Sequence, residues 1–384
     1  MITTINNKHK KLNVPNLRFP EFQGEWEEER LADIADLYKG TGISKDQLSD
    51  DGEPCILYGE LYTKYKSETI REVISKTNID NTKLVRSKAN DVIIPCSGET
   101  AEDIATARCV LNGNILLGGD LNIIRLHGYD GAFMSYQLNG RRKYDIAKVA
   151  QGVSVVHLYG EHLKGVKTIN PCLEEQKKIA SLLALLDERI TTQNKIIDKL
   201  QSLIKGLRVR LIQIENGNIV HLGEIAQIYQ PQTISSTELT EDGFLVYGAN
   251  GIIGKYKQYN HKTEQICITC RGNTCGMVNY TKPMSWITGN AMVINTDEHQ
   301  NKVCKRYLYH YLSAYNFNSI ISGSGQPQIV RTPLEQLKVT LPTFLEQKQK
   351  ATFLDKIQGK IEICNKALNL YLQQKQYLLR QMFI

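Results

Sequence analysis

The chain has 384 residues, 41% of them hydrophobic, which is enough for about two to three ordinary domains with real cores. No run of about eighteen apolar residues occurs, and the N-terminal MITTINNKHKKLNVP lacks the apolar stretch of a secretory signal, so we expect a cytoplasmic protein. The net charge of +7 suits a polyanionic partner, but residues 1–169 are nearly balanced, so charge alone does not identify a nucleic-acid binder. Nine cysteines without an export signal favour reduced thiols over a disulfide framework.

Residues 17–169, after a tail over residues 1–16, are predicted to form a first α+β module. Short apolar runs at 91–95, 115–117 and 121–124 are typical of strands bounded by Gly and Asn turns, and residues 134–150 have a helical pattern. Side chains able to read bases or hold phosphates fall in the loops between these runs. They are Lys64 and Lys66 around Tyr65, then Ser97, Glu99 and Thr100, and further on Arg108. A strand edge guarded by lysines and an ordinary exposed loop acid are the rival interpretations.

Residues 170–216 are predicted to form one long helix. Asn170-Pro171 offers a cap followed by proline at the first helical position, Glu174 and Glu175 lie in the positively polarised first turn, and Asn216-Gly217 supplies the stop. Apolar side chains recur at alternating spacings of four and three, which is the seam of a left-handed coiled coil interrupted only by Gln193. The seam residues are Ile179, Leu183, Leu186, Ile190, Ile197, Leu200, Ile204, Leu207 and Leu211.

Residues 217–340 are predicted to form a second, similar module, with strands at 265–269 and 291–294 and a helical stretch over 302–321. Arg271 and Asn273 follow the first of these strands, where a guanidinium and an amide could read guanine and adenine edges; a tight turn is the rival interpretation. Lys255 and Lys257 alternate with tyrosines and are candidate phosphate contacts. The tyrosines between 307 and 315 are expected in the core.

Residues 341–384 are predicted to form a second long helix with the same register, although Lys350 and Lys375 occupy seam positions. Its seam residues are Leu354, Ile357, Ile361, Cys364, Leu368, Tyr371, Leu378 and Met382. Each helix has about forty residues, roughly 60 Å at 1.5 Å per residue, and its stripe needs a partner. We expect the two helices to pair antiparallel within one chain, separating the modules; a homodimeric coiled coil is the alternative.

The chain also repeats itself. Leu31–Tyr38 returns as Leu222–Tyr229, Gly119–Ile124 as Gly289–Ile294, and the Pro171…Glu175-Gln-Lys177 segment as Pro342…Glu346-Gln-Lys348. The offset falls from 191 to 171, so the first module carries about twenty extra residues. The predicted fold is therefore α+β: two similar modules and two long helices forming an antiparallel intramolecular coiled coil with pseudo-two-fold symmetry.

Catalytic and metal sites are not indicated. Asn170-Pro-Cys-Leu173 lacks the second proline and the aromatic residue of an amino-methyltransferase motif. Cys267, Cys270 and Cys275 lack a fourth ligand for zinc, and buried structural thiols explain them better. We expect a chain that is not an enzyme and that binds no metal.

In the order and duplication of its motifs, the sequence resembles the specificity subunits of Type I restriction-modification systems. The matching pieces are Leu17-Arg-Phe-Pro-Glu-Phe22 with Trp26, Gly323-Ser-Gly-Gln-Pro-Gln328 before Leu334, and both Pro…Glu-Gln-Lys helix starts. In the first module the Gly-Ser-Gly-Gln pattern is reduced to Gln151-Gly-Val-Ser154. The resemblance adds Gln326, Gln328 and Arg331 to the candidate DNA contacts.

The resemblance implies a specific role. Such a subunit holds two target-recognition domains apart with its paired helices and reads a bipartite, asymmetric site in double-stranded DNA. It binds two modification (methyltransferase) subunits and recruits restriction (translocase and nuclease) subunits. S-adenosylmethionine, ATP and Mg²⁺ would then belong to those partners, with no cofactor bound by this chain. The alternative function is a coiled-coil DNA- or protein-binding module without a modification partner.

Overall fold

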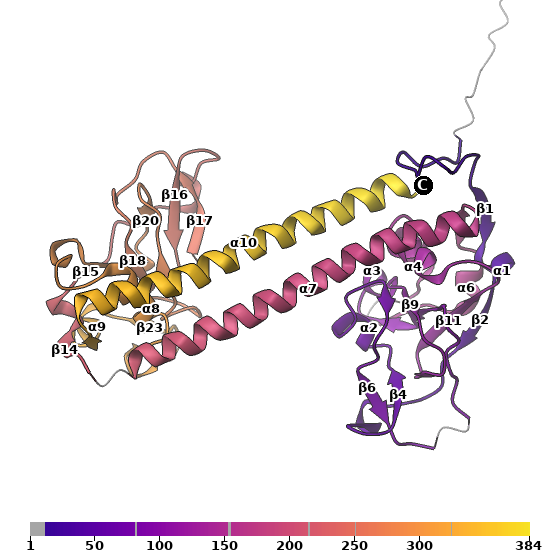
Figure 1. Ribbon diagram of the computed structural model, residues 1–384, viewed down its shortest axis with the longest axis horizontal. Coiled ribbons are helices and arrows are strands. Elements are labelled where there is room, and N and C mark those ends of the chain that lie inside the picture. The colour runs from indigo at the N-terminus through magenta and orange to yellow at the C-terminus, as the bar shows by residue number, and fades with distance from the viewer. Residues whose placement is uncertain (1–11, 81–82, 153–154, 214–215, 250, 324) are drawn as a thin grey trace, which may run out of the picture. The chain divides into compact units, whose positions relative to one another are not determined.

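The computed structural model describes residues 12–80, 83–152, 155–213, 216–249, 251–323 and 325–384 (Figure 1). The chain divides into two compact units. Unit 1 combines the chain up to Gln193 with Leu368–Ile384, and unit 2 runs from Asn194 to Ala367. Each unit therefore contains one globular part and a portion of each long helix.

Unit 1 is built on two sheets. The larger has the order β2 (Ala35–Lys39), β11 (Leu121–Leu126), β7 (Asp91–Pro95), β9 (Arg108–Val110) and β5 (Thr69–Ile70). The smaller has the order β10 (Leu116–Leu117), β4 (Glu53–Ile56), β6 (Ser75–Thr77) and β3 (Leu48–Ser49). Two antiparallel ribbons complete it: β1 (Glu27–Arg30) with β13 (Lys167–Asn170), and β8 (Ser97–Gly98) with β12 (Val156–His157). The strands predicted at 91–95, 115–117 and 121–124 are confirmed as β7, β10 and β11.

The helices of unit 1 other than the two long ones are short. They are α1 (Leu31–Ile34), α2 (Glu60–Thr63), α3 (Ala101–Ile104), α4 (Gly131–Asn139), α5 (Lys143–Val149) and α6 (Gly160–Lys164), with a 3₁₀ turn, η1, at Lys45–Gln47. The helical stretch predicted over 134–150 is thus two helices. Gly140, whose N–H donates to Tyr136 O at 3.0 Å, ends the first of them.

Unit 2 repeats this plan with fewer strands. Its sheets have the orders β15 (Gln227–Tyr229), β21 (Ala291–Asn295), β18 (Ile266–Thr269), β19 (Val278–Tyr280) and β17 (Gly251–Tyr256), β16 (Phe244–Gly248), β20 (Trp286–Ile287). Its ribbons are β14 (Asn218–His221) with β24 (Lys338–Leu341), and β22 (Ile321–Ser322) with β23 (Gln328–Ile329). Its shorter helices are α8 (Lys305–Leu312) and α9 (Arg331–Glu335), with 3₁₀ turns η2 (Leu222–Glu224), η3 (Ser236–Glu238), η4 (Asp297–His299) and η5 (Phe317–Ser319).

The pairing of equivalent strands shows that the duplication extends to the topology. β4 pairs parallel with β10 in unit 1, as β16 does with β20 in unit 2. β7 lies antiparallel to β11, as β18 does to β21. The helix predicted over 302–321 is shorter than expected, because only Lys305–Leu312 is α-helical before the chain turns at η5.

The long helices α7 (Leu173–Ile212) and α10 (Phe344–Met382) pair along the predicted seam. In unit 1, Ile179 and Leu183 of α7 share a core with Met382 near the end of α10. In unit 2, Ile204 and Leu211 share a core with the seam residues Leu354, Ile357 and Ile361 near the start of α10. The two helices therefore run in opposite directions within one chain, as expected from the sequence.

The seam assignment agrees with burial on both helices. Of the predicted seam residues, eleven are buried and the others are half-buried. The buried ones are Ile179, Leu183, Leu186, Ile197, Ile204, Leu211, Leu354, Ile357, Ile361 and Cys364, together with Met382 at the end of α10. The alternating spacing of four and three thus identified the apolar face of each helix correctly.

The predicted cap of the first long helix was wrong. Asn170 is the last residue of β13, where its buried side chain donates to Thr168 Oγ1 and Glu29 Oε2, both at 2.9 Å. Helix α7 begins at Leu173, and the carbonyl of Pro171 accepts from the Gln176 side chain at 2.8 Å. Asn170, which local cap signals assigned to the helix, therefore belongs to the ribbon with β1, and Pro171 precedes the helix by two residues.

Each unit has its own apolar core. In unit 1, Trp26 packs edge-on against Phe133 of α4, and Phe133 stacks on Phe383 just after α10. In unit 2, Tyr307 and Tyr311 of α8 are buried, which confirms the core role predicted for the tyrosine-rich stretch. Among the described residues, no helix is apolar over a length that would cross a bilayer.

Candidate nucleic-acid interface

The same backbone construction stands at the end of an inner strand in both units. After β7 comes Cys96-Ser-Gly-Glu-Thr100, and after β18 comes Cys270-Arg-Gly-Asn-Thr274. The N–H of each cysteine donates to the carbonyl of the residue that precedes the neighbouring strand. The carbonyl of each cysteine accepts from a backbone N–H in a second segment of the chain. The bonds are Cys96 N to Asp120 O (2.7 Å) and Leu158 N to Cys96 O (2.8 Å), and Cys270 N to Asn290 O (3.1 Å) and Ile329 N to Cys270 O (3.0 Å).

The second segment is a hairpin that turns at an equivalent glycine. Gly152 has φ +122° and Gly323 has φ +91°, values that glycine adopts without strain. A Cβ at Gly152 would lie 2.1 Å from Val155 O, and one at Gly323 would lie 2.4 Å from Gln326 O. We call these assemblies the strand-end platforms: residues 96–100, 151–152 and 155–158 in unit 1, and 270–274, 321–323 and 325–329 in unit 2. Val153, Ser154 and Ser324 lie outside the described residues.

The platforms present different side chains on this shared backbone. Ser97 lies opposite His157 in unit 1, with Ser97 Oγ 3.3 Å from His157 Nδ1, and Arg271 lies opposite Gln328 in unit 2. Arg271 and Gln328 are exposed, as are Glu99, Asn273 and Gln326, while Ser97 and His157 are half-buried. Arginine and the amide side chains are the groups that read guanine and adenine edges in the major groove.

The platform of unit 1 is flanked by two cavities that share Ser97 in their walls. One, of about 580 Å³, is lined by Lys39, Asp120, His157 and Lys164 among others. The other, of about 570 Å³, lies between Ser97 and the tyrosines Tyr58 and Tyr62. Side chains on this platform therefore have room to change position when a ligand arrives.

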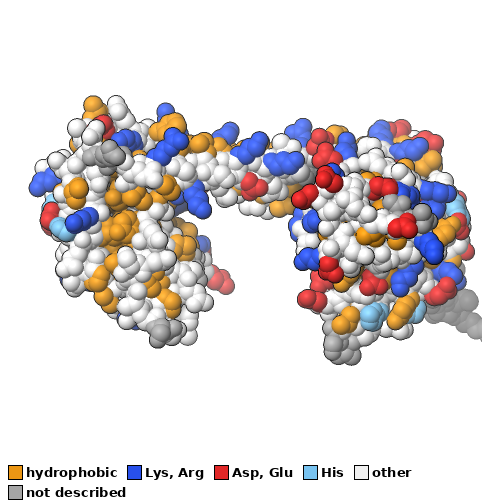
Figure 2. Space-filling view, turned by 90° about the horizontal axis from the view of Figure 1, so that it is seen from below, with side chains coloured by type: hydrophobic (Ala, Val, Ile, Leu, Met, Phe, Trp, Pro, Cys, Tyr) orange, Lys and Arg blue, Asp and Glu red, His pale blue; other side chains and the backbone are white. Residues whose placement is uncertain are grey.

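In unit 2 the hairpin of β16 and β17 reaches the platform. Ala249 O, at its turn, accepts from the hydroxyls of Thr269 and Thr274. Next to this turn, Ile252 and Ile253 are 54% and 45% exposed, and isolated apolar side chains of this kind can contact thymine methyl groups. In the view of Figure 2, charged side chains are sparse on the face of unit 2 at the left, whereas basic and acidic side chains alternate on the face of unit 1 at the right.

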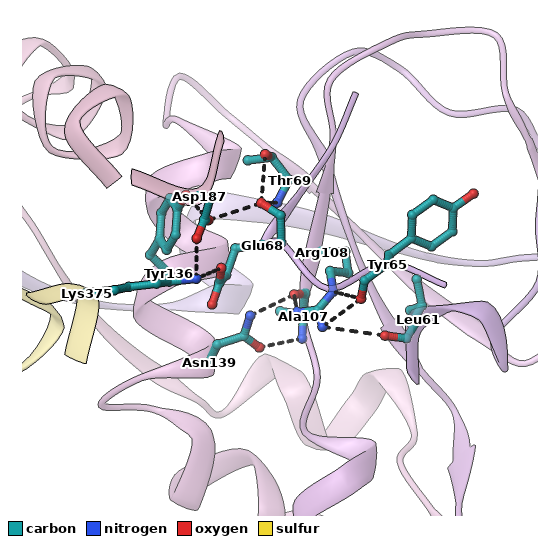
Figure 3. Close-up of polar contacts among 11 residues, drawn as sticks. Leu61, Tyr65, Glu68, Thr69, Ala107, Arg108, Tyr136, Asn139, Asp187 and Lys375 are labelled. Carbon is teal, nitrogen blue, oxygen red and sulfur yellow. Dashed lines mark hydrogen bonds and ion pairs between the residues drawn. The ribbon is translucent and has the colours of Figure 1, made fainter. Parts of the chain in front are cut away.

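Arg108, predicted as a DNA contact, has an internal structural role that weakens this prediction. Its guanidinium donates to the carbonyls of Tyr65 (3.2 Å), Ala107 (3.0 Å) and Leu61 (3.4 Å), as Figure 3 shows. Burial lowers the pKa of this guanidinium. Arg108 therefore ties β9 to α2 and the segment after it, and most of its donor groups are bound to carbonyls inside unit 1.

Two further predicted contacts also have roles inside unit 1. Lys64 Nζ donates to Glu60 Oε1 (2.7 Å) and Ser75 Oγ (2.6 Å), and Glu60 is buried, so Lys64 neutralises an internal carboxylate. Thr100 caps α3 through its hydroxyl, which accepts from Asp103 N at 3.1 Å. Both positions were chosen for residue type and loop location, which do not reveal internal partners.

The remaining lysine and arginine candidates are at the surface. Lys66 donates to Tyr62 O at 2.8 Å, Lys255 lies 3.6 Å from Asp242, and Arg331 pairs with Glu335 at 2.7 Å on α9. Lys257 is exposed, and among the described residues no ion pair to it occurs. These four stay candidates for phosphate contacts, with Lys257 the best placed.

The residues that local reasoning missed are His157, Val155 and Tyr159 near the unit 1 platform. Tyr159 is 53% exposed and its ring lies 6.1 Å from that of His157. Aligning the two Cys-x-Gly-x-Thr segments and carrying the correspondence to the glycine of each hairpin would have paired His157 with Gln328. The weak likeness of Gln151-Gly-Val-Ser154 to the second hairpin hid that match.

The described residues contain no group of three His, Cys, Asp or Glu side chains arranged to hold a metal ion. The cysteines of the two platforms behave as structural thiols. Burial raises the pKa of Cys96 to about 11 and also raises the pKa of Cys270, so neither is an activated thiolate.

A family model described as the Type I restriction modification DNA specificity domain matches residues 23–202 and 215–372. Each match covers one globular part and most of one long helix. The two matches together span most of the chain, so the internal duplication corresponds to two copies of one known domain.

Curated and solved proteins give the same result. The Type I restriction enzyme MjaVIII specificity subunit of Methanocaldococcus jannaschii is 25% identical over 397 residues, covering 91% of this chain and 89% of that protein. The crystal structure of a Type-I restriction-modification S subunit from M. genitalium is similar with a TM-score of 0.74 and 18% identity, covering 97% of this chain and 99% of that one. A chain from a structure of complex assembly and conformational transition in a type I R-M system has a TM-score of 0.51 and 15% identity, covering 93% and 97%. At these identities the solved structures support the fold.

Proposed function

The chain belongs to the family of Type I restriction-modification DNA specificity domains, and from this premise we propose that each of its units reads one half of a split DNA target. Specificity subunits are the non-catalytic members of their complexes. The proposal assigns recognition of double-stranded DNA to this chain. It assigns S-adenosylmethionine, ATP and Mg²⁺ to the modification and restriction subunits.

The observation that carries this proposal is the pair of strand-end platforms. One backbone construction occurs twice, with Ser97 and His157 in one copy and Arg271 and Gln328 in the other. A repeated scaffold that differs in its exposed hydrogen-bonding groups is suited to reading two different short sequences. The target should therefore be asymmetric, unlike the palindrome that a symmetric homodimer would read.

The long helices supply the surface that we propose for the modification subunits. Outside the seam, α7 exposes Leu203 (49%) and α10 exposes Ile363 (62%) in unit 2, and α10 exposes Leu370 (64%) and Tyr377 (58%) in unit 1. Apolar side chains repeated on one helix face are costly to leave in water, so they mark an interaction surface. Because the chain belongs to a family of Type I specificity domains, we propose a modification subunit as the occupant of this surface.

The test is co-expression of the chain with its modification subunit, followed by mapping of methylated bases across a genome. We expect methylation at a sequence of two unlike halves separated by a fixed gap. Methylation by the chain alone, or cutting of DNA by the chain alone, would contradict a non-catalytic role. Purified chain that binds DNA but never associates with the modification subunit would favour the alternative of an independent coiled-coil binding module.

A further inference from the structure

The two strand-end platforms can be superimposed residue by residue from their hydrogen bonds. Leu158 and Ile329 make the same bond to the equivalent cysteine carbonyl, so the residue before each, His157 and Gln328, occupies the same position. The glycines at 152 and 323 are each followed three residues later by the carbonyl that a Cβ would strike. Both hairpins therefore have the same register against the strand end.

The register places one pair of side chains in each unit directly across the ribbon. These pairs are Ser97 with His157 and Arg271 with Gln328. Directly opposed residues on neighbouring strands have Cβ atoms about 4.5–5.5 Å apart, close enough to contact one base pair or two adjacent ones. Their hydrogen-bonding groups differ, since a guanidinium and an amide in unit 2 replace a hydroxyl and an imidazole in unit 1.

The space around each strand-end platform can accommodate either pair of side chains. Ser97 is bordered by cavities of about 580 and 570 Å³, which leave space for a longer side chain. Arg271 and Gln328 are exposed, so shortening them uncovers no core. The platform glycines and the backbone bonds involve none of the four side chains.

We propose that Ser97 with His157 and Arg271 with Gln328 are equivalent base-reading pairs, which set the preferred base at corresponding positions of the two half-sites. Exchanging the pairs should therefore exchange the preferred bases at these positions. The preferred bases at the other positions of each half-site should stay the same. This inference rests on the proposed function, because it assumes that each unit reads one half-site.

The experiment uses the complex of the full chain with its modification subunit. One variant carries Ser97→Arg with His157→Gln, and a second carries Arg271→Ser with Gln328→His. Matched controls are Lys76→Gln on β6 in unit 1 and Lys338→Gln on β24 in unit 2, both exposed and outside the platforms. Methylation mapping and competition binding against libraries randomised in one half-site are the readouts.

For each exchange we expect discrimination at one or two adjacent positions of a single half-site to change by about ten- to a hundredfold, with the other half-site unchanged. The controls should keep the original target. Exchanged complexes that melt like the parent and keep its base preference at every position would overturn the inference. Where an exchange abolishes methylation, competition binding against the DNA libraries measures the base preference. An unchanged preference in that measurement would also overturn the inference.

The two proposals fail in different ways. If the unmodified complex directs methylation to no split target, the proposed function is wrong whatever the variants do. If it does so and the exchanged pairs leave that target as it was, only the assignment of the reading pairs is wrong. The single changes Arg271→Lys and His157→Asn give smaller perturbations should an exchanged chain fold poorly.

Discussion

Two lysines show why residue type alone does not define a DNA contact. Lys64 and Lys257 occupy similar tyrosine-flanked positions in the sequence, but Lys64 is bound to buried Glu60, while Lys257 is exposed. A lysine already committed to an internal carboxylate has little to gain from a phosphate. The structure thus separates two candidates that the sequence treated alike.

Lys257→Ala should weaken binding of the complex to all DNA sequences and lower the log–log salt slope by about one, because one phosphate contact and its released counterion are lost. Lys64→Ala is the matched control: it should leave the slope unchanged and lower the melting temperature. Fluorescence titrations at several salt concentrations measure both. Equal slopes for parent and Lys257→Ala would remove Lys257 from the interface.

Lys375 is a seam residue whose charge is balanced inside unit 1. Its ammonium lies 2.6 Å from Asp187 Oδ1 and also contacts Glu68, and all three side chains are mostly buried (Figure 3). Tyr136 of α4 donates to Asp187 at 2.7 Å. Burial raises the pKa of Glu68, which Lys375 opposes. The cluster therefore joins α4, α7 and the end of α10.

Lys375→Met should lower the free energy of unfolding by about 3–5 kcal/mol, because it leaves two buried carboxylates without their counterion. Adding Glu68→Gln and Asp187→Asn removes those charges and should recover much of the loss. Urea denaturation measures both variants. If Lys375→Met is as stable as the parent, the cluster does not stabilise unit 1.

In unit 2, the buried side chain of His310 on α8 joins Arg208 of α7 to Asp355 of α10. Arg208 Nε, which can only donate, lies 3.1 Å from His310 Nδ1, so the ring proton is on Nε2, which donates to Asp355 Oδ1 at 2.8 Å. Burial is the main reason that the pKa of His310 is lowered; the positive charges of Arg208 and Arg306 add to the effect, and Asp355 opposes it. The folded unit thus prefers a neutral imidazole.

The stability of unit 2 should therefore fall as the pH drops below the ordinary histidine pKa of about 6.5, because the unfolded state takes up a proton that the folded state does not. Thermal melts between pH 7.5 and 5 should show this fall in the parent and a smaller one in His310→Gln. His221→Gln, at an exposed histidine, is the control. Identical pH profiles for parent and His310→Gln would be inconsistent with a buried neutral imidazole.

At the scale of the element, two adjacent residues of α7 have different roles: one stabilises the fold, and the other lies on the surface proposed for assembly. In α7, Ile204 is 5% exposed and belongs to the core of unit 2, whereas its neighbour Leu203 is 49% exposed. The seam stabilises the chain, and the exposed stripe beside it is the surface that we propose for the modification subunit. The two roles are carried by different faces.

Ile204→Ala should cost about 2–5 kcal/mol of stability through lost burial and a cavity. Leu203→Ala should change stability little but reduce affinity for the modification subunit. Denaturation and pull-down from purified components distinguish these outcomes. A Leu203→Ala chain that binds its partner as tightly as the parent would exclude this stripe as the docking surface.

At the scale of the whole molecule, we expect the length of the helix pair to determine the gap between the two halves of the DNA target. Seven residues inserted into both α7 and α10 keep the seam in register and add about 10 Å of helix, or about three base pairs of DNA. Methylation mapping should therefore show the same two half-sites with a wider gap. An insertion variant that methylates the original spacing would contradict this role for the helices.

The sequence by itself determined the duplication, the α+β class and the register of both long helices. These features are local or periodic, so spacing alone reveals them: Ile179, Ile204 and Ile361 were placed on buried faces from their positions in a repeat. The strand runs at 91–95 and 291–294 were equally clear, because continuous apolar runs of that length are buried on both faces.

Only the tertiary structure decided which polar residues face inward. Arg108 is held by carbonyls more than forty residues earlier in the chain, and Lys375 reaches Glu68 across 307 residues. His157 became a candidate only when its hairpin was seen beside Ser97. Partners so distant in sequence leave no periodic signal, because the energy of a buried charge depends on what the fold brings next to it.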